Sequence, residues 1–193
     1  LVTRPVKLNY VQNVEKLDLT GGILAVTYND ESVVVPVVSS ANRKYIPVCF
    51  MPEGMVYTNA LFFIDEATIY TFGILTSNVH NAWMRTVCGR LKSDYRYSNT
   101  MAYNTFPWPT PTDEQKAAIE KTAQAILDAR ALYPDCSLAD LYDEVAMPPE
   151  LRKAHQENDK AVMRAYGFWG KLNTESACVA ELMKMYQKLV EKG

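Results

Sequence analysis

Histidine, cysteine and glycine are scarce in this sequence, and their scarcity limits the chemistry that it can support. The 193 residues include two histidines, four cysteines and eight glycines. The cysteines are separated by about forty residues each and form no CxxC pair, so reduced thiols are expected rather than a zinc or redox site. GxGxxG, P-loop, GxSxG and HExxH motifs are all missing. We therefore expect no catalytic residue, no metal site and no bound cofactor in this chain.

Long apolar runs and an excess of charge of either sign are missing too. The longest apolar stretches, such as residues 46–50 and 60–64, are much shorter than a membrane span. A formal net charge of −2 does not mark the whole chain as a basic nucleic-acid binder, so any such site must be local. No signal-peptide pattern follows Leu1. We interpret the chain as a cytoplasmic piece of a longer protein, without a membrane partner.

The composition changes near Trp108. Residues 1–109 contain most of the aromatic and β-branched residues, whereas residues 110–193 are rich in Ala, Lys, Glu, Leu and Met. This shift predicts an α+β protein with two parts. The first is a mixed, β-rich domain over residues 1–109, and the second is a small, all-helical module over residues 110–193.

Turn and cap signals divide the first part into short elements. A hairpin is expected from residues 22–28 and 32–38, with Pro36 on an edge strand. Further strands are expected at 45–50, 60–64 and 68–72, and a helix is expected from the cap Ser77 to a stop at Gly89.

The second part follows a proline-rich segment, residues 106–111, which favours an extended connection. Helices are then expected from the cap Thr112 to Leu132, from the cap Ser137 to Val145, from Glu150 to Tyr166 with Gly167 as C-cap, and from the cap Thr174 through Leu189.

Residues 90–98 carry the strongest local signal for function. If this segment is one extended strand, four charged residues share one face, Arg90, Lys92, Asp94 and Arg96, while Leu91, Ser93, Tyr95 and Tyr97 share the other. Arg and Lys can donate to guanine O6 and N7, and Asp can accept from cytosine N4. The row therefore suits contact with DNA bases. The open alternative is a solvated strand face whose charges pair with each other.

Two polar loops, residues 39–44 and 76–80, could bind phosphate through backbone amides and side chains. Plain turns remain the alternative for both loops, and a packed histidine for His80. The residues predicted to contact phosphate or to position the DNA are Ser39, Ser40, Arg43, Ser77, Asn78, His80, Arg85 and Arg90.

Many collinear segments between residues 33 and 190 together resemble one known family. They include Phe72-Gly73-Ile74-Leu75-Thr76-Ser77, Gly89-Arg90-Leu91, Tyr95-Arg96-Tyr97-Ser98, Tyr103-Asn104-Thr105-Phe106-Pro107-Trp108-Pro109 and Leu151-Arg152-Lys153-Ala154-His155. The sequence resembles the target-recognition and C-terminal regions of the MmeI-like enzymes, which are type IIG (type IIL) restriction-modification proteins. Residues 1–32 match only loosely.

The resemblance implies a DNA-binding module of a parent protein with an S-adenosylmethionine-dependent adenine-N6 methyltransferase domain, and in many relatives a nuclease that would use Mg²⁺. Double-stranded DNA and the parent's methyltransferase domain would be its partners. Within the family pattern, Lys92 and Asp94 would specify one base pair, and Arg96 and Ala60 a neighbouring one. The competing hypothesis is a protein-interaction module that docks on the parent's catalytic domain without contacting DNA bases.

Overall fold

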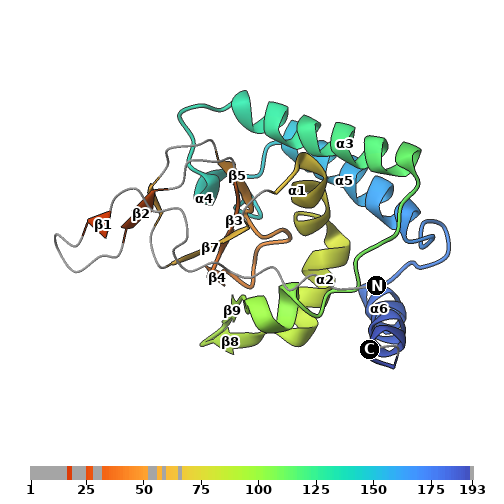
Figure 1. Cartoon of the computed structure of the whole chain (residues 1–193). Helices are drawn as coiled ribbons and strands as arrows, with labels where there is room; N and C mark the ends of the chain where they lie inside the picture. The colour runs from red at the N-terminus through yellow and green to blue at the C-terminus, as the bar shows by residue number, and fades with distance from the viewer. Residues whose placement is uncertain are drawn as a thin grey trace.

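Helices and three small antiparallel sheets make up the computed structural model, which describes residues 17–18, 25–27, 32–51, 56–57, 60–64 and 67–191 (Figure 1). The predicted α+β class with a helical second part is confirmed. The strands are β1 (Leu17–Asp18), β2 (Ala25–Thr27), β3 (Ser32–Pro36), β4 (Val38–Ser39), β5 (Cys49–Met51), β6 (Val56–Tyr57), β7 (Leu61–Ile64), β8 (Gly89–Leu91) and β9 (Asp94–Arg96). The helices are α1 (Ile69–Leu75), α2 (Asn78–Val87), the π-helical turn η1 (Asn99–Tyr103), α3 (Asp113–Ala131), α4 (Leu138–Leu141), α5 (Pro149–Ala165) and α6 (Glu175–Val190).

The predicted hairpin between residues 22–28 and 32–38 is wrong. Strand β3 lies between β5 and β7, while β2 pairs with β1 and β6. Pro36 is therefore not on an edge strand. It lies at the end of the central strand, where it pairs with Leu61 of β7 and the pairing with β5 has already stopped. Proline lacks an N–H, and this is tolerated at Pro36 because β5 no longer pairs with β3 at this position.

Two further strand predictions need correction. Residues 68–72 were expected to be extended, but they open helix α1, because the Thr68 hydroxyl accepts a hydrogen bond from the Thr71 N–H and caps its first turn. Of the strand expected at residues 45–50, only the end becomes β5. The Ile46 N–H instead donates to Asn81 Oδ1 at 2.8 Å, and Pro47 has no N–H for a sheet.

The predicted helix caps at Ser77, Thr112, Ser137 and Thr174 are confirmed, and each side chain accepts a backbone N–H of the first turn. Gly167, at φ +70°, follows α5 as predicted. Helix α2 ends at Val87, and Gly89 begins β8 instead of capping the helix.

Helix α4 stops at Leu141, short of the expected Val145. The Asp143 carboxylate accepts the N–H groups of Val145 and Ala146, and this local turn competes with the helix. Among the described residues, no helix is long and apolar enough to cross a membrane.

The two parts of the chain pack around shared hydrophobic clusters. Phe106, in the extended segment that leads to α3, is buried together with Trp83 of α2, Ile119 of α3 and Leu182 of α6. The predicted boundary at residues 109–110 thus lies in a connecting segment that is itself part of the core. Division into two separate folding units remains a prediction.

Helix α5 connects the two parts through two adjacent buried polar residues. Asn158 donates to the Gly73 carbonyl at 2.8 Å and accepts from the Thr122 hydroxyl, so it joins α1 to α3. Asp159 accepts the Asn78 N–H at 2.7 Å, at the start of α2, and the Tyr45 hydroxyl at 2.6 Å. A carboxylate at the N-terminus of α2 is favoured there by the helix dipole.

Burial changes the acid–base behaviour of these contacts. Desolvation raises the pKa of Asp159 to about 6, although the hydrogen bonds from Tyr45 and Asn78 oppose that rise. Desolvation lowers the pKa of His80 to about 3 and holds the pKa of His155 well below its ordinary value. Both histidines are therefore neutral near pH 7.

Replacing Asp159 by Asn is expected to change how stability depends on pH. A carboxyl group whose pKa is raised on folding contributes stability at acidic pH, and this contribution is lost as the pH rises through the folded-state pKa. Between about pH 4 and pH 7, the free energy of unfolding of the native protein should fall relative to that of Asp159→Asn by on the order of 2 kcal/mol. Urea denaturation of both proteins across this range measures the difference.

The comparison isolates Asp159 because both proteins keep His80 and His155. The lowered pKa values of these histidines have the opposite effect, since they make the folded state lose stability as the pH falls. A difference between the two proteins that stays constant with pH would contradict the assigned titration of Asp159.

Candidate nucleic-acid interface

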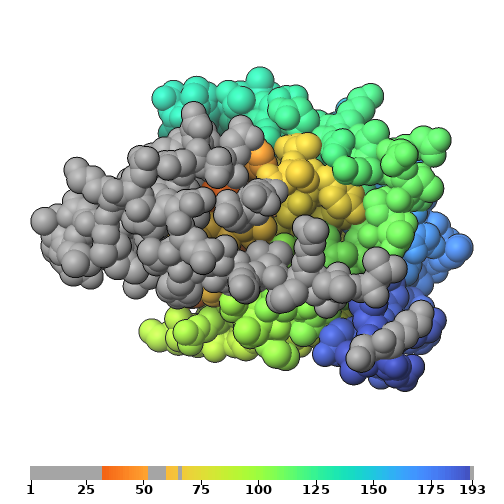
Figure 2. Space-filling view, viewed as in Figure 1, coloured from red at the N-terminus to blue at the C-terminus, as the bar shows by residue number. Residues whose placement is uncertain are grey.

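Strand pairing brings two of the predicted segments together. Strand β4, which leads into the loop of residues 39–44, pairs with β9, so that Val38 lies opposite Arg96 and Ser39 opposite Tyr95. Strands β8 and β9 form a hairpin, called here the 89–96 hairpin, at the rim of the molecule and far from α3 (Figure 1). Its atoms lie uncovered along the lower edge in Figure 2. The loop and the hairpin therefore form one surface.

Residues 90–98 are not the single extended strand that the alternation predicted. The chain turns back at Lys92 and Ser93, so that Leu91 pairs with Asp94 and Arg90 with Tyr95. Residues directly opposite each other in an antiparallel pair point to the same side. Asp94 and Arg96 thus share a face, as predicted, but Arg90 lies on the opposite one.

The predicted inner face is right for the tyrosines and wrong for the other two residues. Tyr97 is buried and Tyr95 is half-buried, whereas Leu91 is 50% exposed and Ser93 is also exposed. The reason is the hairpin: Leu91 lies opposite Asp94 and therefore shares the face of Asp94, and Ser93 lies in the turn.

The turn itself has an unusual backbone. Lys92 has φ +56°, in the left-handed region that Gly, Asn or Asp generally occupies in a two-residue hairpin turn. Among the described residues it is the only non-glycine residue with a positive φ. The side chain of Lys92 projects from the exposed end of the hairpin.

Arg90 is bound within the hairpin. Its Nη1 donates to the Ser93 carbonyl at 2.8 Å, and its Nη2 donates to the Tyr95 hydroxyl at 3.0 Å. Its guanidinium carbon lies 4.2 Å from the centre of the Tyr95 ring. These contacts hold the turn from behind, on the face opposite Asp94.

Asp94 connects the hairpin to the polar loop. Its Oδ1 accepts the N–H of Ala41 at 3.3 Å, while the Ser40 hydroxyl accepts the N–H of Asn42 and the Ser40 carbonyl accepts the N–H of Arg43. Ser39 is buried, and Ser40 and Arg43 are half-buried. The backbone N–H groups of Ala41, Asn42 and Arg43 are therefore already bound, either within the loop or by Asp94.

Ala60 lies close to Arg96 through the backbone. The Val37 N–H donates to the Ala60 carbonyl at 2.9 Å, and the Tyr97 N–H donates to the Val37 carbonyl at 2.8 Å. Ala60 is exposed. Val37 thus links Ala60 to Tyr97, the residue that follows Arg96.

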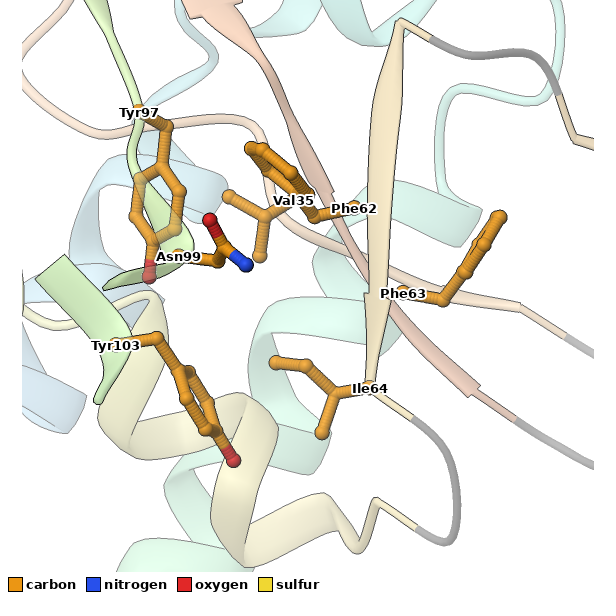
Figure 3. Close-up of a pocket in the computed structure, with 7 residues that line it drawn as sticks. All are labelled: Val35, Phe62, Phe63, Ile64, Tyr97, Asn99 and Tyr103. Atoms are coloured by element: carbon orange, nitrogen blue, oxygen red, sulfur yellow. The ribbon is translucent and has the colours of Figure 1, made fainter. Parts of the chain in front are cut away.

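Buried aromatic side chains support the base of the 89–96 hairpin. The Tyr97 hydroxyl lies 2.9 Å from His80 Nε2, and the His80 ring packs edge-on against Phe106. Burial raises the pKa of Tyr97 well above its ordinary value, so both partners of this hydrogen bond are neutral. Next to Tyr97 there is a small apolar hollow, with Phe62 facing it from β7 (Figure 3). We interpret this hollow as part of the hairpin's apolar support.

Four of the residues predicted to contact phosphate are buried or already bound to other groups of the protein. Ser77 and His80 are buried, and the Ser77 hydroxyl donates to the Ile74 carbonyl. The Asn78 N–H at the start of α2 already binds the Asp159 carboxylate, which takes the place expected for a phosphate. Arg85 pairs with Glu175 and donates to the Lys44 carbonyl. We therefore do not retain these four residues as phosphate contacts.

Sequence reasoning missed three contributors: the Ala41 amide, the clamp formed by Arg90, and Asp159. The Lys-Ser turn carries no Asn-Gly or Asp-Gly signal, so the sequence had no local mark for a hairpin. Asp159 lies within α5, far along the chain from α2. The sequence therefore predicts only Ser77 as the cap of α2. Among the described residues, no group of three or more His, Cys, Asp and Glu could hold a metal ion.

Comparison with known proteins covers nearly the whole chain. Residues 23–110 match the family model described as "MmeI, target recognition domain", and residues 111–192 match "MmeI, C-terminal domain". DNA methyltransferase A of Bacillus subtilis (strain 168) is 41% identical over 161 residues, which are 83% of this chain and 18% of that protein.

A solved structure of the type IIL restriction-modification enzyme MmeI in complex with DNA is also similar. It has 49% sequence identity and a TM-score of 0.81, over 84% of this chain and 22% of that chain. This chain therefore spans about a fifth of the length of the proteins that it matches.

Replacing Lys92 by Gly is expected to stabilise the folded protein. Gly adopts a positive φ without the steric cost that a side chain brings, so the free energy of unfolding should rise by about 1 kcal/mol. Ser93→Gly is the matched control, because Ser93 lacks this backbone conformation. Denaturation with urea compares the two variants. If Lys92→Gly and Ser93→Gly destabilise the protein equally, the backbone of Lys92 is not strained.

Proposed function

Because this chain belongs to the MmeI family, as its target recognition domain followed by its C-terminal domain, we propose that it is the sequence-specific DNA-recognition module of a restriction-modification methyltransferase. The observation that carries this proposal is the surface on which the 39–44 loop, Ala60 and the 89–96 hairpin lie together. A narrow hairpin with exposed charged side chains can enter the major groove of DNA.

The charges on this surface are available to a ligand. None of the four ion pairs among the described residues includes Arg43, Lys92, Asp94 or Arg96. Arg90 binds Ser93 and Tyr95, and not Asp94. These contacts favour a binding surface over the alternative of a solvated strand whose charges neutralise each other.

Lys92 and Asp94 suit a G·C pair. The Lys92 ammonium can donate to guanine O6 or N7, and the Asp94 carboxylate can accept from N4 of the paired cytosine. The Asp94 contact with the Ala41 N–H uses one oxygen and leaves the second for a base. Arg96 and Ala60 would contact a neighbouring base pair, with Ala60 acting by apolar contact or by leaving space.

The chemistry of methyl transfer belongs to another part of the proposed parent protein. We expect S-adenosylmethionine to bind there and not in this chain, because the eight glycines of this chain form no Gly-rich strand-turn-helix loop. Among the described residues there is also no group of three or more His, Cys, Asp and Glu side chains that could hold a metal ion. Adenine-N6 methylation, and any cleavage that uses Mg²⁺, would therefore take place in an adjoining catalytic domain, with this chain setting the position on DNA.

Selection from a pool of randomised duplexes tests the proposal. The full-length protein should enrich one short sequence, and methylated adenines in DNA from cells that express it should fall in the same sequence. Enrichment without any common sequence would overturn sequence recognition. It would favour the alternative of a module that only docks on the catalytic domain.

Exchanging the two charges should change the specificity at one base pair. The variant Lys92→Glu/Asp94→Arg reverses donor and acceptor, so a position that is G for the native protein should become C, while the other positions stay the same. Each single change leaves one mismatched charge facing a base, and the affinity should fall by on the order of 1–3 kcal/mol. Sequencing of methylated sites measures the outcome, and an unaltered site would refute contact with this base pair.

Arg43 should contribute to affinity without contributing to specificity. Arg43→Ala removes a half-buried cation that belongs to none of the ion pairs among the described residues. Binding to the selected duplex and to a scrambled one should weaken alike, and the slope of log affinity against log salt should fall by about 0.9. Fluorescence anisotropy gives both quantities. Weakening confined to the selected duplex would instead indicate a base contact.

A further inference from the structure

We propose that Arg90 is a positioning residue for base recognition, which fixes the Lys92–Ser93 turn, and that it does not bind phosphate. The inference rests on the proposed function and names a residue on which its specificity depends. It also replaces the phosphate contact predicted for Arg90 from the sequence.

The hydrogen bonds of Arg90 are directed into the hairpin. One terminal nitrogen donates to the Ser93 carbonyl and the other to the Tyr95 hydroxyl, at 2.8 and 3.0 Å. The guanidinium also stacks on the Tyr95 ring, with its carbon 4.2 Å from the ring centre. This planar fork suits Arg and cannot be reproduced by the single ammonium group of Lys.

We call the contacts of Arg90 with Ser93 and Tyr95 the clamp, and its location explains how it could affect base recognition. Arg90 lies opposite Tyr95, on the face away from Asp94 and Arg96, so it supports the hairpin from behind the proposed DNA-contacting face. The Ser93 carbonyl that it holds comes directly after Lys92, whose φ of +56° is unfavourable for a lysine. Without these contacts of Arg90, the turn can relax, and the backbone of Lys92 is no longer held in this conformation.

Tyr95 extends the clamp to the polar loop. It pairs with Ser39 of β4, and the next residue toward the turn, Asp94, accepts the N–H of Ala41. Arg90 therefore holds a unit in which the turn and the loop are fixed before DNA arrives. A surface fixed in advance loses less conformational entropy on binding, and a loose one discriminates poorly between similar base pairs.

The test uses the full-length protein with the variants Arg90→Lys, Arg90→Gln and Tyr95→Phe. Affinity is measured by anisotropy for the selected duplex and for duplexes in which each base pair of the selected site is inverted in turn. Arg90→Lys keeps the charge but loses the fork, so discrimination at one base pair or two adjacent ones should fall by about 3- to 10-fold. Arg90→Gln should lose a similar factor, and Tyr95→Phe a smaller one.

Salt dependence separates positioning from phosphate binding. For a positioning residue, the slope of log affinity against log salt should be the same in Arg90→Gln as in the native protein, although the charge has been removed. A phosphate contact predicts that Arg90→Lys retains discrimination, while Arg90→Gln weakens all duplexes alike and lowers the slope by about 0.9. Lys121→Gln, which removes an exposed cation from α3, is the matched control and should change neither quantity.

The double variant Arg90→Lys/Tyr95→Phe gives an independent criterion. If the two residues act as one clamp, its loss of discrimination should be no greater than that of Arg90→Lys alone. Should Arg90→Lys unfold in a thermal denaturation control, Tyr95→Phe carries the test. Unchanged discrimination in the variants that fold overturns the inference, while the absence of any selected sequence for the native protein overturns the proposed function instead.

Discussion

The buried carboxylate of Asp159 lies where the helical part of the chain meets the part that carries the candidate interface. It accepts hydrogen bonds from the first N–H of α2 and from the Tyr45 hydroxyl, just after the 39–44 loop. Its neighbour Asn158 holds Gly73 of α1. A Cβ at Gly73 would lie 2.8 Å from the Ile119 side chain, so only glycine allows α1 to approach α3 this closely. Helix α5 thereby fixes α1 and α2 together.

This constraint reaches the 89–96 hairpin through α2. His80, on α2, lies within hydrogen-bond distance of Tyr97 at the base of the hairpin, and Asn81 of the same helix accepts the Ile46 N–H that follows the loop. Both supports of the surface therefore start from a helix whose first turn is held by Asp159. In our proposal, the helical part therefore contributes to recognition by holding α2 in place, without contacting a base.

Sequence could predict the elements that depend on local chemistry. Thr112 and Ser137 were identified as caps because a cap and its partners lie within three residues. The sheet pairings could not be predicted in this way. Strand β3 pairs with β5 and β7, which both come later in the chain, and no local signal marks such distant partners. The β-branched and aromatic residues after Thr68 favour a strand, but the Thr68 side chain caps a helix there.

The candidate site shows the same division between local and distant signals. Charged side chains at Lys92, Asp94 and Arg96 were identified from composition and family pattern, and the structure exposes Lys92 and Arg96 on one hairpin. Period-two alternation failed where the chain turns, because a turn residue with a positive φ interrupts the alternation of faces. Because the chain turns, Arg90 lies on a different face from Asp94 and Arg96, whereas one continuous strand would place all three on the same face. Arg90 and Tyr95 hold the hairpin from one face, so their contacts use neither Asp94 nor Arg96, which lie on the other face.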